Sequence, residues 1–194
     1  MKLVTSAQMR MIDHRAINEL GIPGLQLMEN AGQGIAAWIR EIFRDNVKGK
    51  RFAIVCGKGN NGGDGYVIAR HLHQWGAVPQ VFMLASPEEI KGDALTNLQR
   101  IQELGMTIWQ TRQGQPNWIP AFAGMTGRGE AGMMAPEGAG MTTSGRNGFS
   151  SYDMVVDAIF GTGFSGEVDP AVGKVIDAIN SSGATVLAVD TPSG

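Results

Sequence analysis

Cysteine is almost absent from this sequence, in which Cys56 is the only one among 194 residues. A disulfide framework within the chain is therefore excluded. Because Cys56 ends an apolar run, we expect it to be buried in a strand rather than to act as a reactive thiol.

An excess of charge of either sign is also missing, with 16 Lys and Arg against 18 Asp and Glu and a formal net charge of −2. Such a balance attracts neither nucleic acid nor an acidic membrane, and no basic run makes a local exception. The sequence also lacks an apolar stretch long enough to cross a bilayer and a secretory pattern at its N-terminus. We therefore expect a cytoplasmic protein that binds no nucleic acid and no membrane.

Glycine is plentiful by contrast, with 28 residues, and five of them fall between positions 57 and 65. The apolar run at 52–56 is typical of a strand covered on both faces, and from Tyr66 onward the apolar spacing is helical. Between them lies the sequence GKGNNGGDG. The order is therefore strand, loop, helix.

This loop does not match the common nucleotide motifs, because Lys58 precedes the glycine cluster and the spacing of G-x-G-x-x-G is missing. One interpretation is a tight turn whose glycines serve only geometry. The number of glycines, together with Asn60, Asn61 and Asp64, favours the other interpretation, a loop that binds a phosphate-bearing ligand at the start of a helix.

Helical and strand patterns alternate along most of the chain. We expect helices at 6–20, 23–42, 63–75 and 86–104 and from Asp169 onward, and strands at 52–56, 81–84, 107–109, 154–159 and 185–189. This alternation predicts an α/β fold, a three-layer αβα Rossmann-like arrangement with a mainly parallel sheet. Ligands of such folds bind at the carboxyl ends of the strands.

The second expected helix carries a stripe of apolar residues at intervals of three or four positions. Together with Met28, we expect this stripe to face the core. Its members are Leu27, Ala31, Ile35, Trp38 and Ile42. Two polar residues, Glu29 and Asn30, interrupt the helix, and the pattern leaves open whether they are solvated, cap the helix or contact a ligand.

Three aspartates come to the carboxyl edge of the predicted sheet. Asp64 belongs to the glycine loop, Asp157 lies near the end of the strand at 154–159, and Asp190 follows the strand at 185–189. A carboxylate among the apolar neighbours of Asp157 is costly to bury without a cation or hydrogen-bond donors. A cation site at this edge therefore has a physical motive.

Four segments together resemble the NAD(P)HX epimerase family, also called the YjeF N-terminal domain. They are GNNGGDG at 59–65, LMENAG at 27–32, VDAIFGTG at 156–163 and VDTPSG at 189–194, and they occur in the order of the family. The resemblance implies an isomerase of metabolite repair, NAD(P)H-hydrate epimerase, that interconverts the R and S forms of hydrated NADH and NADPH (NADHX and NADPHX).

The resemblance also implies the site residues. It implies a potassium ion held by Asn61, Asp157 and Ser193, and Asp190 as the catalytic acid or base at C6 of the hydrated ring, while Asp64 is open to a positioning role. The implied substrate-binding residues are Asn60, Asn61, Gly62, Gly63, Asp64, Gly161, Thr162, Gly163, Phe164, Ser165, Gly166, Glu167 and Asp190.

The regular pattern stops between residues 112 and 151, where Gly, Met, Thr and Ser dominate. Matching segments flank this interval, so we expect one family-type domain over 1–194 with a disordered insertion at 112–151. Residues 118–126 resemble the translated form of a mobile intergenic repeat. A lid or partner-binding loop, with Trp118, Phe122 and Met133 exposed, is the alternative.

The resemblance further implies that the domain is incomplete at the C-terminus, because the family continues through further strands after the PSG motif. An inactive nucleotide-binding or protein-interaction module of the same fold is therefore the alternative function. For partners, the resemblance implies the small-molecule substrate, a homodimer, and a functional link to an ADP- or ATP-dependent dehydratase that acts on the S form.

Overall fold

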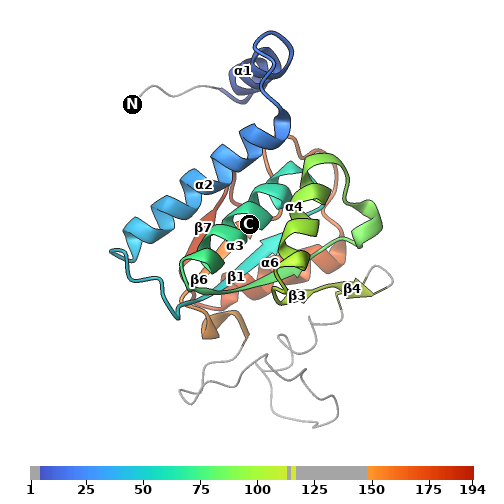
Figure 1. The fold of residues 1–194 in the computed structure, drawn as a ribbon. Helices are drawn as coiled ribbons and strands as arrows, with labels where there is room; N and C mark the ends of the chain where they lie inside the picture. Colours follow the sequence, from blue (N-terminus) through green and yellow to red (C-terminus); the bar gives the residue numbers. More distant parts are fainter. Residues whose placement is uncertain (1–4, 113–114, 117–147) are drawn as a thin grey trace.

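The computed structural model describes residues 5–112, 115–116 and 148–194, and its centre is a parallel sheet. The sheet has five strands in the order β3-β2-β1-β6-β7 (Figure 1). The strands are β1 Arg51–Cys56, β2 Val78–Met83, β3 Ile108–Trp109, β6 Met154–Ala158 and β7 Val186–Ala188. All four pairings are parallel. The Rossmann-like three-layer fold expected from the sequence is confirmed.

The chain starts the sheet at its centre with β1, moves outward to β3, and returns to the other side of β1 with β6. The strand order therefore reverses between β1 and β6, and in open α/β sheets such a switch point is where ligands bind. A separate two-stranded antiparallel pair is formed by β4 Thr111–Arg112 and β5 Gln115–Pro116.

Alternate side chains of β1 enter two different cores. Phe52, Ile54 and Cys56 belong to the core under the helices α2 Gly24–Ile42, α3 Asn60–Gln74 and α4 Gly92–Glu103. Ala53 and Val55 belong to the core on the opposite face, which α6 Pro170–Ser181 covers. Because both faces are covered, the strand is apolar at every position from Phe52 to Cys56, as its unbroken apolar run predicts.

The single helix expected at 86–104 is wrong. A short 3₁₀ turn, η1 Pro87–Glu89, carries the predicted capping box between Ser86 and Glu89, but Ile90 is then extended. Gly92 has a φ of +60°, a conformation that glycine adopts without strain, and α4 begins at this residue. The apolar periodicity continues across this break because Ile90, Ala94, Leu98 and Ile101 all reach the same core.

The buried face of α2 also differs from the expected one. Its buried residues are Met28, Gly32, Ala36 and Ile39, whereas Trp38 keeps 56% of its surface exposed. The reason is close helix packing, because a Cβ at Gly32 would lie 2.5 Å from the Cβ of Val67 in α3. Small residues thus face α3, and Trp38 and Ile42 of the expected stripe are turned outward, whereas Ile35 still packs against the core.

The first helix, α1 Ser6–Asn18, has the predicted capping box, in which Thr5 and Gln8 exchange hydrogen bonds. It projects from the body of the molecule (Figure 1). Its apolar residues are accordingly exposed, Ile12 by 50% and Met11 by 60%. Among the helices in the described residues, none combines the length and apolar character needed to span a membrane.

Most of the expected insertion at 112–151 lies outside the described residues, and so do Trp118, Phe122 and Met133 of the alternative lid. The last part of that interval is described and forms a 3₁₀ turn, η3 Gly148–Ser151. Phe149 of this turn is buried, with its ring centroid 5.7 Å from that of Phe82. The ordered core therefore resumes at Gly148, earlier than the sequence pattern indicated, because Phe149 directly follows the low-complexity segment.

Candidate functional site

Close packing explains four of the five glycines between positions 57 and 65, which lie just after β1 and in the first turns of α3. A Cβ at Gly62 would lie 2.0 Å from the carbonyl oxygen of Gly57, and one at Gly57 would lie 2.2 Å from the carbonyl oxygen of Ile159. An added Cβ would lie 2.7 Å from the Met28 side chain at Gly63 and 2.7 Å from the Cys56 sulfur at Gly65. A Cβ at Gly59 would meet nothing within 4 Å. The glycines therefore let α3 start directly against the end of the sheet, and a ligand role for the loop depends on its polar groups.

Those polar groups include the first N–H groups of α3, which have no acceptor within the helix. The N–H of Gly63 is the first that bonds back, to the carbonyl of Gly59. Asn60, at the first position of the helix, is exposed. The start of α3 therefore presents donors and the positive end of the helix dipole at the switch point of the sheet.

Asn61 joins α3 to the loop that follows β6. Its side-chain Nδ2 donates to the carbonyl oxygen of Phe160 at 2.8 Å. Its Oδ1 is buried and has no hydrogen-bond partner among the described residues. A buried oxygen of this kind costs about 1–3 kcal/mol unless a donor or a cation satisfies it.

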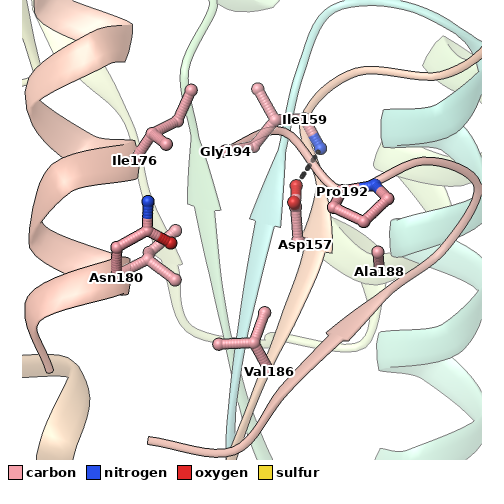
Figure 2. A pocket seen from close by; sticks show the side chains of 9 residues that line it. Asp157, Ile159, Ile176, Asn180, Val186, Ala188, Pro192 and Gly194 are labelled. Atoms are coloured by element: carbon pink, nitrogen blue, oxygen red, sulfur yellow. Dashed lines mark hydrogen bonds between the residues drawn. The ribbon is translucent and has the colours of Figure 1, made fainter. Parts of the chain in front are cut away.

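Asp157 and Ser193 form the centre of the site. Asp157 is only 5% exposed. Its Oδ1 accepts from the Ser193 hydroxyl at 2.8 Å and from the N–H of Ile159 at 3.1 Å, and its Oδ2 accepts from the N–H of Ser193 at 2.8 Å. Figure 2 shows the bond to Ile159. The sequence left open whether a cation or hydrogen-bond donors compensate the burial of this carboxylate. The structure supplies the donors.

The backbone of Phe160 connects the three residues expected to hold a cation. Its carbonyl accepts from Asn61, and its N–H donates to the hydroxyl of Ser193 at 3.3 Å. Asn61, Asp157 and Ser193 are therefore brought together by α3, β6 and the segment after β7. In the described part of the chain no three His, Cys, Asp or Glu residues gather to hold a metal ion, so any ion here would have mixed oxygen ligands.

Asp190 lies beside the next residues of the same loop. Its Oδ2 accepts from the N–H of Thr162 at 2.6 Å. A Cβ added to Gly161 would lie 2.8 Å from that oxygen and 3.5 Å from the Cβ of Asn61. The loop after β6 thus passes between Asn61 and Asp190, and a side chain at position 161 would displace the Asp190 carboxylate.

Asp64 is the third acid expected at this edge, and its environment differs from that of the other two. It is half-buried on α3. Burial, followed by the negative charges of Asp190 and Asp13, raises the pKa of Asp64 to about 7. The contribution of Asp13 places α1 near the site, which nothing in the sequence pattern indicated.

The rest of the second glycine loop is exposed. The N–H of Phe164 bonds to the carbonyl of Gly161 at 2.9 Å, and its ring stacks on that of Phe160 with centroids 3.9 Å apart. Gly166 has a φ of +111°. The remaining residues expected to bind substrate, Gly163, Ser165 and Glu167, lie in this exposed loop, and within the described residues no hydrogen bond joins them to Asn61, Asp157 or Ser193.

A pocket of about 220 Å³ lies on the other side of Asp157, between α6 and β7 (Figure 2). Its walls combine apolar side chains, such as Ile159, Ile176 and Val186, with the polar groups of Asp157 and Asn180. Asn61, Asp64 and Asp190 do not line it. The pocket therefore touches the site only through Asp157 and the residues next to Ser193.

Glu29 has a role that the sequence left undecided. It is half-buried on α2, where its carboxylate bonds to Arg70 and to Nε2 of His71 at 2.8 Å, and Arg100 lies 3.6 Å away. Burial acts to raise the pKa of Glu29, but the hydrogen bonds and charges of Arg70 and His71 outweigh it and lower the pKa. Glu29 thus ties α2 to α3 and α4, and its three partners were not apparent from the sequence.

Comparison with known proteins gives consistent matches. The family model for "YjeF-related protein N-terminus" matches residues 24–194. The "Bifunctional NAD(P)H-hydrate repair enzyme Nnr" of Moorella thermoacetica is 41% identical over 194 residues, which is 100% of this chain and 32% of the relative. The "NAD(P)H-hydrate epimerase" of Pirellula staleyi is 35% identical over 190 residues, 95% of this chain and 69% of the relative.

Among solved structures, the crystal structure of the yeast protein ynu0 (YNL200c) matches with a TM-score of 0.74 and 25% identity, covering 100% of this chain and 72% of that one. The chain spans about a third of the length of the bifunctional relatives.

The packing of the glycines predicts opposite outcomes for two substitutions in one loop. Gly62→Ala should lower the free energy of unfolding by about 1–3 kcal/mol, because the added Cβ meets backbone that cannot move aside. Gly59→Ala should change this free energy by less than about 1 kcal/mol. The position has room for a Cβ, and the only cost is that alanine is a poorer helix N-cap than glycine. Urea unfolding followed by circular dichroism measures both. Equal losses in the two variants would contradict the packing explanation.

Proposed function

The chain belongs to the family of YjeF-related protein N-termini, and we propose that it is an isomerase that interconverts the R and S forms of NADHX and NADPHX. The names of its relatives as NAD(P)H-hydrate epimerases support this activity. The observation that carries the proposal is the cluster at the switch point of the sheet, where Asn61, Asp157, Ser193 and Asp190 are joined through the loop after β6.

In this proposal the dinucleotide lies across the carboxyl ends of β1 and β6. The N–H groups at the start of α3, from Asn60 to Gly62, and those of the loop 161–167 bind its phosphates, as helix starts and glycine-rich loops do. Asp190 contacts the hydrated nicotinamide ring and acts at C6, because its carboxylate is exposed while its position is fixed by Thr162. A non-catalytic interaction module has no need of a carboxylate held in this way, so its presence favours the enzyme.

The oxygen atoms around Asp157 fit a potassium ion. The unpartnered Oδ1 of Asn61, the carboxylate of Asp157 and the hydroxyl of Ser193 are hard oxygen ligands of the kind that alkali cations bind. When bound, the ion supplies positive charge next to the phosphates of the substrate. The residues of this chain supply the rest, since Asp157 fixes Ser193 and Asn61 fixes the loop after β6.

The remaining expectations from the sequence belong to this proposal. They are one domain of this type over 1–194 with a low-complexity insertion at 112–151, a cytoplasmic location, and a link to an ADP- or ATP-dependent dehydratase. The name "bifunctional repair enzyme" of several relatives supports the link.

The outward apolar face of α1 and α2 supports a homodimer. This face, which we call the α1/α2 face, includes Met11, Ile12 and Leu20 on or just after α1 and Trp38 and Ile42 on α2, each more than two-fifths exposed. Large apolar side chains left exposed on two helices are of the kind that a subunit interface covers. A second copy of this chain can cover the α1/α2 face without any other protein, since the interface of a two-fold dimer uses the same surface of both subunits.

The first experiment is chromatography of (R)-NADPHX incubated with the chain, compared with the variant Asp190→Asn. The wild-type chain should produce the S form, and the variant should lose about 10²–10⁴ in kcat. Its fold should persist, because the amide oxygen of Asn still accepts from the N–H of Thr162. Asp45→Asn, at an exposed ion pair with Arg40, is the matched control. Full activity in Asp190→Asn would remove Asp190 from the reaction.

The potassium site is tested by thermal unfolding in KCl and in tetramethylammonium chloride of equal ionic strength. At ten times its Kd, the ion should raise Tm by about 3–6 °C. Asp157→Asn should abolish this difference, whereas Asp153→Asn, whose carboxylate pairs with Lys50 elsewhere, should keep it. Equal Tm values of the wild type in both salts would refute the site.

Sedimentation velocity tests the dimer. The wild-type chain should sediment as a dimer, and Trp38→Glu should sediment as a monomer because it places a charge in the α1/α2 face. Leu104→Glu alters a similarly exposed residue at the end of α4 and should remain a dimer. A monomeric wild type, or a dimer that Trp38→Glu leaves intact, would show that this face is not the interface.

A further inference from the structure

The two acids of the site that are not expected to hold the cation, Asp64 and Asp190, are held in different ways. Asp190 is exposed and accepts a short hydrogen bond from the N–H of Thr162, at 2.6 Å. Such a bond to a backbone donor fixes the position of the carboxylate. Asp64 is half-buried, and within the described part of the chain its carboxyl group has neither a hydrogen-bond donor nor a cation as partner.

Burial and two acidic neighbours oppose the ionisation of Asp64. Asp13 approaches from α1 and Asp190 from the segment after β7, and both are acidic. From β1 comes the thiol of Cys56, whose pKa is raised by burial and by the charge of Asp64. On the α2 side, Gly32 faces the backbone of Asp64, and the carboxylate of Glu29 is taken by Arg70 and His71.

We propose that Asp64 is a second catalytic residue of the epimerisation, the acid that protonates the departing hydroxyl, while Asp190 is the base that deprotonates the returning water. This inference rests on the proposed function, and it separates two roles that the sequence could not divide. The pKa of about 7 for Asp64 agrees with it, because a catalytic acid is most effective with a pKa near the working pH.

Epimerisation at C6 proceeds by loss of the hydroxyl as water and its return on the other face of the ring. The carboxyl proton of Asp64 passes to the hydroxyl oxygen at C6, the C6–O bond breaks with its electron pair leaving in water, and the lone pair of ring N1 forms an N1=C6 double bond. Water then adds to the opposite face of C6, the double-bond pair returns to N1, and Asp190 takes a proton from the added water. Exchange of protons with solvent restores Asp64 as acid and Asp190 as base, and the reverse reaction uses the two in exchanged roles.

The pH dependence of kcat/KM for conversion of (R)-NADPHX to the S form tests the assignment. In the wild type it should fall as pH rises through about 7, because Asp64 then loses the proton that it must donate. Asp64→Asn should lower kcat by about 10²–10⁴ and remove this alkaline fall, since an amide does not titrate. Circular dichroism and binding of NADP⁺ show that the variant is folded.

A second variant keeps the test independent of the folding of Asp64→Asn. Asp13→Asn removes a like charge, so the pKa of Asp64 should drop and the alkaline fall should move to lower pH. Asp45→Asn, at its exposed ion pair with Arg40, should leave the profile in place.

The outcomes separate this inference from the proposed function. A wild-type chain without turnover overturns the proposed function and the role of Asp64 with it. An active wild type overturns the role of Asp64 alone if Asp64→Asn keeps the wild-type rate and alkaline fall, or if Asp13→Asn does not move that fall. Loss of the fall in Asp64→Asn and its shift in Asp13→Asn establish Asp64 as the acid.

Discussion

The carboxylate of Asp157 is the interaction on which the rest of the site depends. It lies on a central strand with almost no exposure, and its three hydrogen bonds all come from residues beyond the strand. A buried carboxylate without such donors is strongly destabilising. The chain therefore has to return after β7 with Ser193 in place, and the loop after β6 has to turn so that Ile159 donates. Everything else at the switch point is arranged around these two conditions.

Close approach of backbone segments is the second constraint. Gly57 and Gly62 let α3 begin directly against the strand end, and Gly161 lets the next loop pass between Asn61 and Asp190. On the outer side of α3, Gly32 lets α2 approach, and Glu29 then joins three helices through Arg70, His71 and Arg100. The helix that carries Asn61 and Asp64 is thus fixed from both sides, as a preorganised site requires.

The carboxyls of Asp64 and Asp190 belong to the same site and have different surroundings. A backbone donor fixes the position of the Asp190 carboxylate, whereas Asp64 faces burial and two acidic neighbours. A raised pKa lets one carboxyl serve as the acid beside a second that serves as the base, and in this way one site provides both at neutral pH. α1 contributes through Asp13 although its body projects from the fold, so the exposed helix has an electrostatic effect on the site.

The sequence by itself determined the layers, the parallel sheet and the residues at its carboxyl edge, because apolar periodicity is local and parallel strands bring their ends to one side. It placed Asp64, Asp157 and Asp190 there correctly. Only the tertiary structure decided which face of α2 is buried, why four loop glycines are needed, and what Glu29 binds. Those outcomes depend on contacts between distant segments, such as that between Asn61 and Phe160, 99 positions apart, which no local pattern encodes.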